Sequence, residues 1–285
     1  MHPCHRACNP ARGRYGAGVL SKARFQSLQK LTRKKERTEA GMFFVEGWRW
    51  LEEALDMPHP PRCVLTVPGA ARSAAESGLL ARAQARALEF AEVSTEQLAR
   101  LTENVNPPGV AALVEWRPST LEALLDAQMA GGPSMLIALD GVGDPGNAGT
   151  IVRTADWFDV GGILFGEGSV EPSNSKTTRA TMGSLFHLPV AVTDSLGPAL
   201  ERLRVGDYSI VGAALDGDDL GTFAWPDRCV LVVGSEANGI RPSVAGLLDK
   251  RVRIPSYGRA ESLNVAVASA LLMADWRRGH PGRAG

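Results

Sequence analysis

The second half of the chain alternates short apolar runs with longer amphipathic segments. Continuous apolar runs lie at 134–139, 161–165, 187–192, 209–215 and 229–233. Runs of this length without polar alternation are typical of strands buried on both faces of a parallel sheet. Helical patterns lie between them, at 148–158, 173–185, 197–203 and 241–248. The pattern predicts an α/β domain with a mostly parallel sheet over residues 134–278.

The first half shows a weaker version of the same alternation. Strands are predicted at 42–45, 63–67, 88–93 and 109–116, with helical patterns over 21–55 around the first strand, at 70–87 and at 94–101. These elements predict a smaller α/β domain over residues 21–116. Residues 117–133 contain Pro118, one short helical stretch and a Gly-Gly-Pro sequence, and are predicted to form a linker. Residues 1–20 are predicted to be a disordered basic tail, and 279–285 a short C-terminal tail.

The last long segment, residues 250–276, is predicted to hold a buried helix. A β-type run at 251–254 is followed by an Ala- and Val-rich segment that is apolar on nearly every side. A helix that is apolar all round is normally buried. Three polar residues, Glu261, Ser262 and Asn264, stand at its start, where polar side chains cap a helix or hold a ligand. Ser262 alone would suffice as the cap.

Charge is balanced over the whole chain but not along it. The 285 residues carry 31 Lys and Arg against 31 Asp and Glu, whereas residues 1–40 hold ten basic residues and only two acidic ones. A basic segment on a neutral body predicts a polyanionic partner, because phosphates bind such segments without regard to sequence. A solvated tail is the alternative, preferred for residues 1–20, and a transit peptide is disfavoured because amphipathic apolar spacing is missing. The candidate RNA-binding residues here are Lys30, Arg33, Lys34, Lys35 and Arg37.

Cysteines and hydropathy indicate a cytoplasmic protein. The four cysteines are scattered, which favours reduced thiols over a disulfide framework. No apolar run reaches the length of a membrane span, and no leader resembles a secretory signal, so no membrane contact is expected. His2, Cys4, His5 and Cys8 could ligate a metal, but they lack a second ligand pair. A disordered tail is therefore preferred there, and no metal is predicted.

The first strand of the second half ends in a glycine-rich loop. Its spacing matches a dinucleotide-binding fingerprint at Gly141, Gly143 and Gly146. With Glu167 as a ribose ligand, this loop would support an NAD-dependent oxidoreductase. Asp144 and Pro145 argue against it, because one brings negative charge toward a pyrophosphate and the other removes a backbone donor. The following helix is instead expected to begin at Asn147 and to be capped there, with Arg153 on its second turn in reach of a phosphate.

Three strand ends are expected to meet at one edge of the sheet. Ligands of open α/β sheets bind outside the carboxyl ends of the strands. Glu236 follows the strand at 229–233 and lies between two glycines, on the exposed rim. The three loops carry Asn147 and Arg153, Glu236, and Ser262 and Asn264, which are expected to converge on this rim.

The three loops carry recognisable motifs. The stretches DGVGDPGNAGTIVRTA (140–155), LVVGSEANGI (231–240) and RIPSYGRAESLNVAVASALL (253–272) resemble the motifs of the SpoU (TrmH) family of RNA ribose 2′-O-methyltransferases, within the SPOUT superfamily. The resemblance covers residues 134–278 in order and spacing, and three motifs in series are more specific than one glycine fingerprint. Residues 21–55 also resemble the RNA-binding domain that precedes the catalytic domain in many members of the family.

The resemblance implies a cofactor and an assembly. Members bind S-adenosyl-L-methionine in a deep trefoil knot and act as homodimers. By motif position, Gly234, Ile254 and Leu263 would contact the cofactor. The resemblance likewise implies that the catalytic residues are Asn147, Arg153, Glu236, Ser262 and Asn264. A phosphate clamp is hypothesised for Arg153, and an orienting role toward Arg153 or Asn147 for Glu236, while Ser262 and Asn264 would fix the ribose. Residues 174–179 carry polar and basic side chains where an RNA backbone could lie, which makes Lys176 and Arg179 RNA-binding candidates. A solvated helix start explains the same residues equally well.

The expected activity is transfer of a methyl group to a ribose 2′-hydroxyl of structured RNA. Ribosomal RNA is favoured over transfer RNA because of the separate N-terminal domain. The non-enzymatic alternative is an RNA-binding protein or assembly factor without catalytic turnover. Two packing predictions complete the sequence-based picture. His187 begins a strand and is expected to be a packed histidine rather than a catalytic base. The tryptophans Trp48, Trp50, Trp157 and Trp276 are expected to pack in the core or at a dimer interface rather than to stack on bases.

Overall fold

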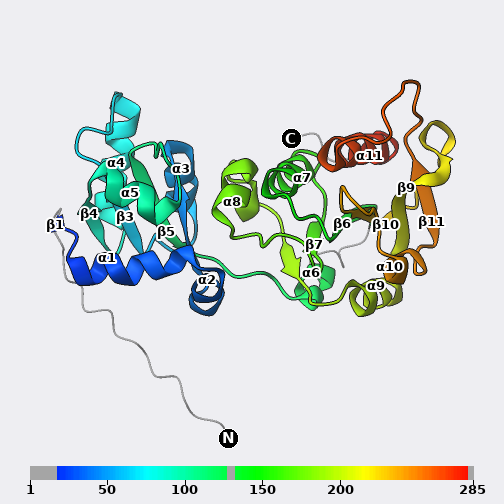
Figure 1. Cartoon of the computed structure of the whole chain (residues 1–285), viewed down its shortest axis with the longest axis horizontal. Coiled ribbons are helices and arrows are strands. Elements are labelled where there is room, and N and C mark those ends of the chain that lie inside the picture. The colour runs from blue at the N-terminus through cyan, green and yellow to red at the C-terminus, as the bar shows by residue number, and fades with distance from the viewer. Residues whose placement is uncertain (1–17, 127–131, 282–285) are drawn as a thin grey trace, which may run out of the picture.

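The computed structural model describes residues 18–126 and 132–281, which form two α/β domains side by side (Figure 1). The possible metal ligands His2, Cys4, His5 and Cys8, for which a disordered tail was the preferred interpretation, lie outside these residues. Within the described ranges, no group of three or more His, Cys, Asp or Glu side chains is arranged to hold a metal ion. Over the same ranges, none of the helices combines the length and the apolar character needed to cross a bilayer.

The N-terminal domain is built on a five-stranded mixed sheet in the order β1-β4-β3-β5-β2. Its strands are β1 (Gly18–Val19), β2 (Met42–Glu46), β3 (Cys63–Thr66), β4 (Phe90–Glu92) and β5 (Val110–Glu115). Its helices are α1 (Lys22–Gln29), α2 (Lys34–Ala40), α3 (Trp48–Asp56), α4 (Ala74–Arg86) and α5 (Thr95–Thr102). Capping boxes start α4 and α5, because a serine and the residue three positions later each satisfy a backbone donor of the other.

Two boundaries differ from the sequence-based expectation. Residues 18–20, predicted to lie in a disordered tail, pair β1 with β4 and bury Leu20. The helical stretch of the predicted linker is α6 (Leu121–Asp126), and it packs under the C-terminal sheet with Leu124 fully buried. Both segments carry apolar side chains, Leu20 and Leu124, that are buried when the segment packs on its domain, and this burial stabilises the observed positions.

The C-terminal domain is built on six parallel strands in the order β11-β9-β10-β6-β7-β8. The strands are β6 (Ser134–Asp140), β7 (Gly162–Phe165), β8 (Val190–Val192), β9 (Ser209–Asp219), β10 (Arg228–Gly234) and β11 (Lys250–Arg253). The helices are α7 (Pro145–Trp157), α8 (Ser175–Thr181), α9 (Leu196–Val205), α10 (Pro242–Ala245) and α11 (Val265–Gly279). The predicted α/β class with a mostly parallel sheet is confirmed, whereas the trefoil knot stays a prediction.

Both faces of this sheet are covered by helices, α7 and α11 on one side and α6, α9 and α10 on the other (Figure 1). Neighbouring strand residues such as Leu136 and Ile137 therefore point into different cores, and both are buried. This double burial explains why the strands are continuously apolar. Helix α11 is not buried all round as predicted, because Val267 and Leu271 are 49% and 43% exposed.

The two domains share one apolar core. It runs from the α3 face of the N-terminal sheet to the α7 and α11 face of the C-terminal sheet. At the junction, the ring of Trp50 from α3 meets Phe186 edge to face, with ring centroids 5.2 Å apart. Trp157 is the exception among the named tryptophans, because it is 84% exposed at the end of α7 and does not belong to the core.

His187 joins the domains by charge. It follows a 3₁₀ turn (Ser184–Phe186) and is partly exposed, so its prediction as a packed residue starting a strand was wrong. Its Nδ1 lies 2.9 Å from Asp156 Oδ2 on α7, and its Nε2 lies 3.0 Å from Glu53 Oε2 on α3. Burial opposes protonation of the imidazole, but the hydrogen bonds to Asp156 and Glu53 outweigh burial and raise the pKa of His187 above 6.5.

This contact makes stability depend on pH. Because the folded-state pKa is raised, the stabilisation is fully present below pH 6.5 and is lost as pH rises through the folded-state pKa. We expect the melting temperature of the wild type to fall over this window, and His187→Gln to flatten the fall. Melting curves recorded at a series of pH values for the wild type and for His187→Gln would test this. An unchanged slope in His187→Gln would refute the assignment.

Candidate active site

Three of the predicted catalytic residues form a hydrogen-bonded chain. Asn147 lies in the first turn of α7, Glu236 in the loop after β10, and Asn264 immediately before α11. Asn147 donates from Nδ2 to Glu236 Oε1, and its Oδ1 accepts from Asn264 Nδ2 at 2.9 Å. One amide thus uses its donor and its acceptor on two different loops. The sheet order makes this possible, because β10 lies beside β6.

The two helix starts that carry these asparagines are capped differently from the prediction. Helix α7 begins at Pro145, and Asp144 Oδ1 accepts the Asn147 N–H at 2.8 Å, so Asp144 is the cap. Asn147 is thereby freed for side-chain contacts. Asn264, not Ser262, caps α11, because its Oδ1 accepts the N–H groups of Ala266 and Val267 at 2.9 and 3.3 Å. Capping leaves the Asn264 amide nitrogen facing Asn147.

A buried carboxylate fixes the loop after β10. Asp140, the last residue of β6, is fully buried. It accepts the backbone N–H of Arg241 at 2.7 Å and the Arg241 Nε–H at 2.5 Å. Arg241 also forms an ion pair with Glu167, the residue assigned to a ribose in the dinucleotide alternative. The sequence-based site did not include Asp140 or Arg241, although an aspartate ending a buried strand was a usable signal.

A cavity of about 830 Å³ lies beside the hydrogen-bonded chain. The loops after β10 and β11 line it, and all three predicted cofactor residues, Gly234, Ile254 and Leu263, belong to its wall. Glu236 and Ser262 lie in the same lining. Residues 213–216 complete one side, in the part of β9 where the pairing register with β11 jumps from Gly212 to Asp218.

Gly234 has no room for a side chain. A Cβ built on it would lie 2.0 Å from the carbonyl carbon of Gly239 and 2.2 Å from the nitrogen of Ile240. The loop 235–239 therefore folds back directly onto the end of β10, and Ser235 and Gly239 exchange backbone hydrogen bonds at 2.9 and 3.1 Å. This close return shapes the cavity wall.

The other two predicted catalytic residues lie outside the chain of contacts. Arg153 is exposed on α7, and Ser262 is exposed in the loop before α11. Among the residues that the structure describes, neither has a hydrogen-bond or ion-pair partner for its side chain. The structure thus brings Asn147, Glu236 and Asn264 together and leaves Arg153 and Ser262 available to a ligand.

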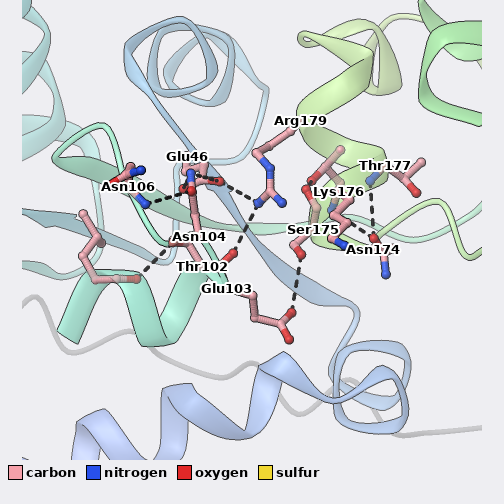
Figure 2. Close-up of polar contacts among 12 residues, drawn as sticks. Glu46, Thr102, Glu103, Asn104, Asn106, Asn174, Ser175, Lys176, Thr177 and Arg179 are labelled. Carbon is pink, nitrogen blue, oxygen red and sulfur yellow. Dashed lines mark hydrogen bonds and ion pairs between the residues drawn. The ribbon is translucent and has the colours of Figure 1, made fainter. Parts of the chain in front are cut away.

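The predicted RNA-binding residues divide into two groups. Lys30, Arg33, Lys34, Lys35 and Lys176 are exposed. Arg37 is only 7% exposed and forms an ion pair with Glu171, so the structure contradicts a direct phosphate contact. Arg179 is bound to Glu46, with Nη1 2.7 Å from Oε1 (Figure 2). These two arginines hold the domains together.

The dinucleotide alternative fits the geometry poorly. The N-terminus of α7, where a pyrophosphate would bind, is already capped by the Asp144 carboxylate. The fingerprint glycines Gly141, Gly143 and Gly146 do not line the cavity.

Comparison with known proteins agrees with the motifs. Residues 134–274 match the SpoU rRNA Methylase family, and residues 22–112 match an MRM3-like substrate binding domain. The chain is 32% identical over 251 residues to the 23S rRNA (guanosine(2553)-2′-O)-methyltransferase RlmP of Bacillus subtilis, covering 86% of this chain and 92% of that protein.

Solved structures show the same fold over nearly the whole chain. An AdoMet-bound rRNA methyltransferase from Sinorhizobium meliloti is 30% identical with a TM-score of 0.79, and 94% of this chain and 99% of that one are covered. The SpoU methyltransferase AviRb from Streptomyces viridochromogenes is 28% identical with a TM-score of 0.78, covering 90% and 97%. Two of the motif loops line one cavity, and Asn147 joins the third loop to them. Together with this arrangement, these similarities show that the chain belongs to the SpoU (TrmH) family of RNA methyltransferases, whose cofactor is S-adenosylmethionine.

Proposed function

We propose that this enzyme methylates a ribose 2′-hydroxyl of ribosomal RNA. The observation that carries the proposal is the Asn147–Glu236–Asn264 chain beside the 830 Å³ cavity. The names of the Bacillus subtilis and Sinorhizobium meliloti relatives support ribosomal RNA as the substrate. Transfer RNA is the alternative within the same chemistry, because several further relatives carry the broader description tRNA/rRNA methyltransferase.

The cavity suits S-adenosylmethionine in size and lining. Backbone groups of the two loops offer hydrogen bonds, while Ile254, Leu263 and Leu272 offer apolar contact for a nucleoside. When bound there, the cofactor supplies an electrophilic methyl group. The chain's own contribution is then positioning and electrostatics.

Each candidate residue is given a role in handling the ribose. Arg153 is free to hold a phosphate of the target nucleotide, and as a permanently charged group it is not the proton acceptor. Glu236 orients Asn147, which it contacts, rather than Arg153. Asn264 and Ser262 are assigned to the ribose. A non-catalytic RNA-binding role is the remaining alternative, and measured methyl transfer decides between the two.

Binding measurements test the cofactor site first. Calorimetric titration of the wild type with S-adenosylmethionine is expected to saturate, and titration with NAD to show no binding. Gly234→Ala forces the loop 235–239 away from β10, so we expect cofactor affinity to fall about tenfold or more. Gly143→Ala is the matched control, because its Cβ meets nothing within 4 Å. Binding of NAD alone would overturn the proposal.

Methyl transfer tests the hydrogen-bonded chain. Asn147→Ala removes the amide that links Glu236 to Asn264, and we expect kcat to fall by about 100-fold, the scale of a lost positioned polar group. Affinity for S-adenosylmethionine should stay within about twofold, because Asn147 does not line the cavity. The assay follows labelled methyl transfer to a 23S rRNA transcript and to a tRNA transcript. Thr150→Ala, one turn further along α7, is the control, and full turnover by Asn147→Ala would contradict the role.

A homodimer is also proposed, from the family resemblance and from one exposed surface. Val267 and Leu271 lie one turn apart on α11, directly after Asn264, and both are about half exposed. A second copy covering this face would complete the site. Light scattering at dilute protein and physiological salt is expected to give twice the chain mass, and Val267→Asp with Leu271→Asp to reduce it. A wild-type monomer would refute this assembly.

A further inference from the structure

A buried ion pair crosses the domain interface beside the basic helix α2. Arg37 on α2 is 7% exposed and Glu171, in the segment after β7, is 11% exposed. Arg37 Nε donates to Glu171 Oε1 at 2.8 Å, and Arg37 Nη1 donates to the carbonyls of Leu31 and Thr32 at 3.2 and 2.6 Å. Removing one partner of such a pair leaves a buried charge without compensation. The pair therefore fixes α2 relative to the segment after β7.

A second pair joins the same two parts of the chain. The Glu46 side chain is 5% exposed and lies 2.7 Å from Arg179 Nη1 on α8. Asn104 donates to both Glu46 oxygens at 3.1 Å, and Arg179 also reaches the Thr102 carbonyl at 3.4 Å (Figure 2). Both of these ion pairs involve residues 171–179, the segment that also presents the exposed Lys176.

The segment that holds Glu171 also holds the active-site loop. The Val170 N–H donates to the Val142 carbonyl at 3.0 Å, and the Ser169 hydroxyl accepts the Val142 N–H at 3.1 Å. The same hydroxyl donates to the Leu139 carbonyl at 3.0 Å. Val142 lies in the loop that leads into α7 and Asn147. A short path therefore runs from Arg37 through Glu171 and Val170 to Val142, in the loop that leads into Asn147.

We propose that Glu171 is a positioning residue that sets the N-terminal domain in register with the active site, so that one RNA contacts both. The inference rests on the proposed function. Exposed Lys34 and Lys35 on α2 would then hold RNA phosphates at a fixed separation from Asn147. Without the pair, the N-terminal domain would be held less rigidly against the C-terminal domain. The effective concentration of the target nucleotide at the active site would then fall for RNA bound to α2.

The test separates positioning from stability. Glu171→Gln and Arg37→Met are each expected to raise KM for a 23S rRNA transcript about tenfold, with kcat at saturating RNA and the Kd for S-adenosylmethionine within about twofold. Both changes break the Arg37–Glu171 pair, and Arg37→Met also removes the donors to the Leu31 and Thr32 carbonyls. The double variant should therefore be no worse than Arg37→Met alone. Glu115→Gln is the matched control, because Glu115 pairs with Arg62 on the surface of the N-terminal domain.

Each outcome decides the proposal. An unchanged KM in Glu171→Gln and Arg37→Met overturns the proposal. If kcat and the melting temperature fall while KM stays unchanged, the Arg37–Glu171 pair serves stability alone. If Glu171→Gln does not fold, Arg37→Met and Glu46→Gln supply the same comparison. A wild type that binds the transcript but transfers no methyl group refutes the proposed function instead. Filter binding of the transcript then still tests the inference, and equal Kd values for wild type and variant overturn it.

Discussion

The Asp140 carboxylate, buried at the end of β6, binds both the backbone and the side chain of Arg241. Burying a carboxylate is costly unless it is paired and hydrogen-bonded, so this contact strongly favours one path for the loop after β10. That path places Glu236 against Asn147 and folds residues 235–239 back onto Gly234. The cavity wall and the hydrogen-bonded chain both depend on it. Arg241 does not line the cavity, and its contribution is to hold the loop after β10 in place.

In the C-terminal domain, the strands form the apolar core and the loops carry the polar side chains of the candidate site. The strands are apolar on both faces and hold their ends in a fixed order. The loops carry short polar side chains with two hydrogen-bonding atoms. At Asn264, Oδ1 caps helix α11, which leaves Nδ2 free to donate to Asn147. An amide suits this use because it has a donor and an acceptor on one planar group. A serine at the same cap would leave no such planar partner for Asn147.

The sequence could predict the parallel sheet, because runs of apolar residues reflect burial on two faces, and it could predict that three strand ends meet. It could not assign the caps. Asp144 and Asn147, or Ser262 and Asn264, are equally good cap residues locally, and tertiary contacts decide between them. Nor could it show that Arg37 is buried, since its partner Glu171 lies 134 positions away. Local patterns specify elements, whereas long-range polar partners are set by packing.

The basic run at residues 30–37, which leads into α2, shows why charge counts alone mislead. Lys30, Arg33, Lys34 and Lys35 are exposed, but Arg37, in the same run, is buried and bonded to a carboxylate and two carbonyls. A guanidinium can satisfy several acceptors in one plane and is more weakly hydrated than an ammonium group, so it tolerates burial better than lysine does. Arg37 therefore ties α2 to the C-terminal domain, whereas its basic neighbours in the run stay exposed to solvent. One short segment contributes one side chain to the domain interface and the others to the exposed surface because its side chains point in different directions.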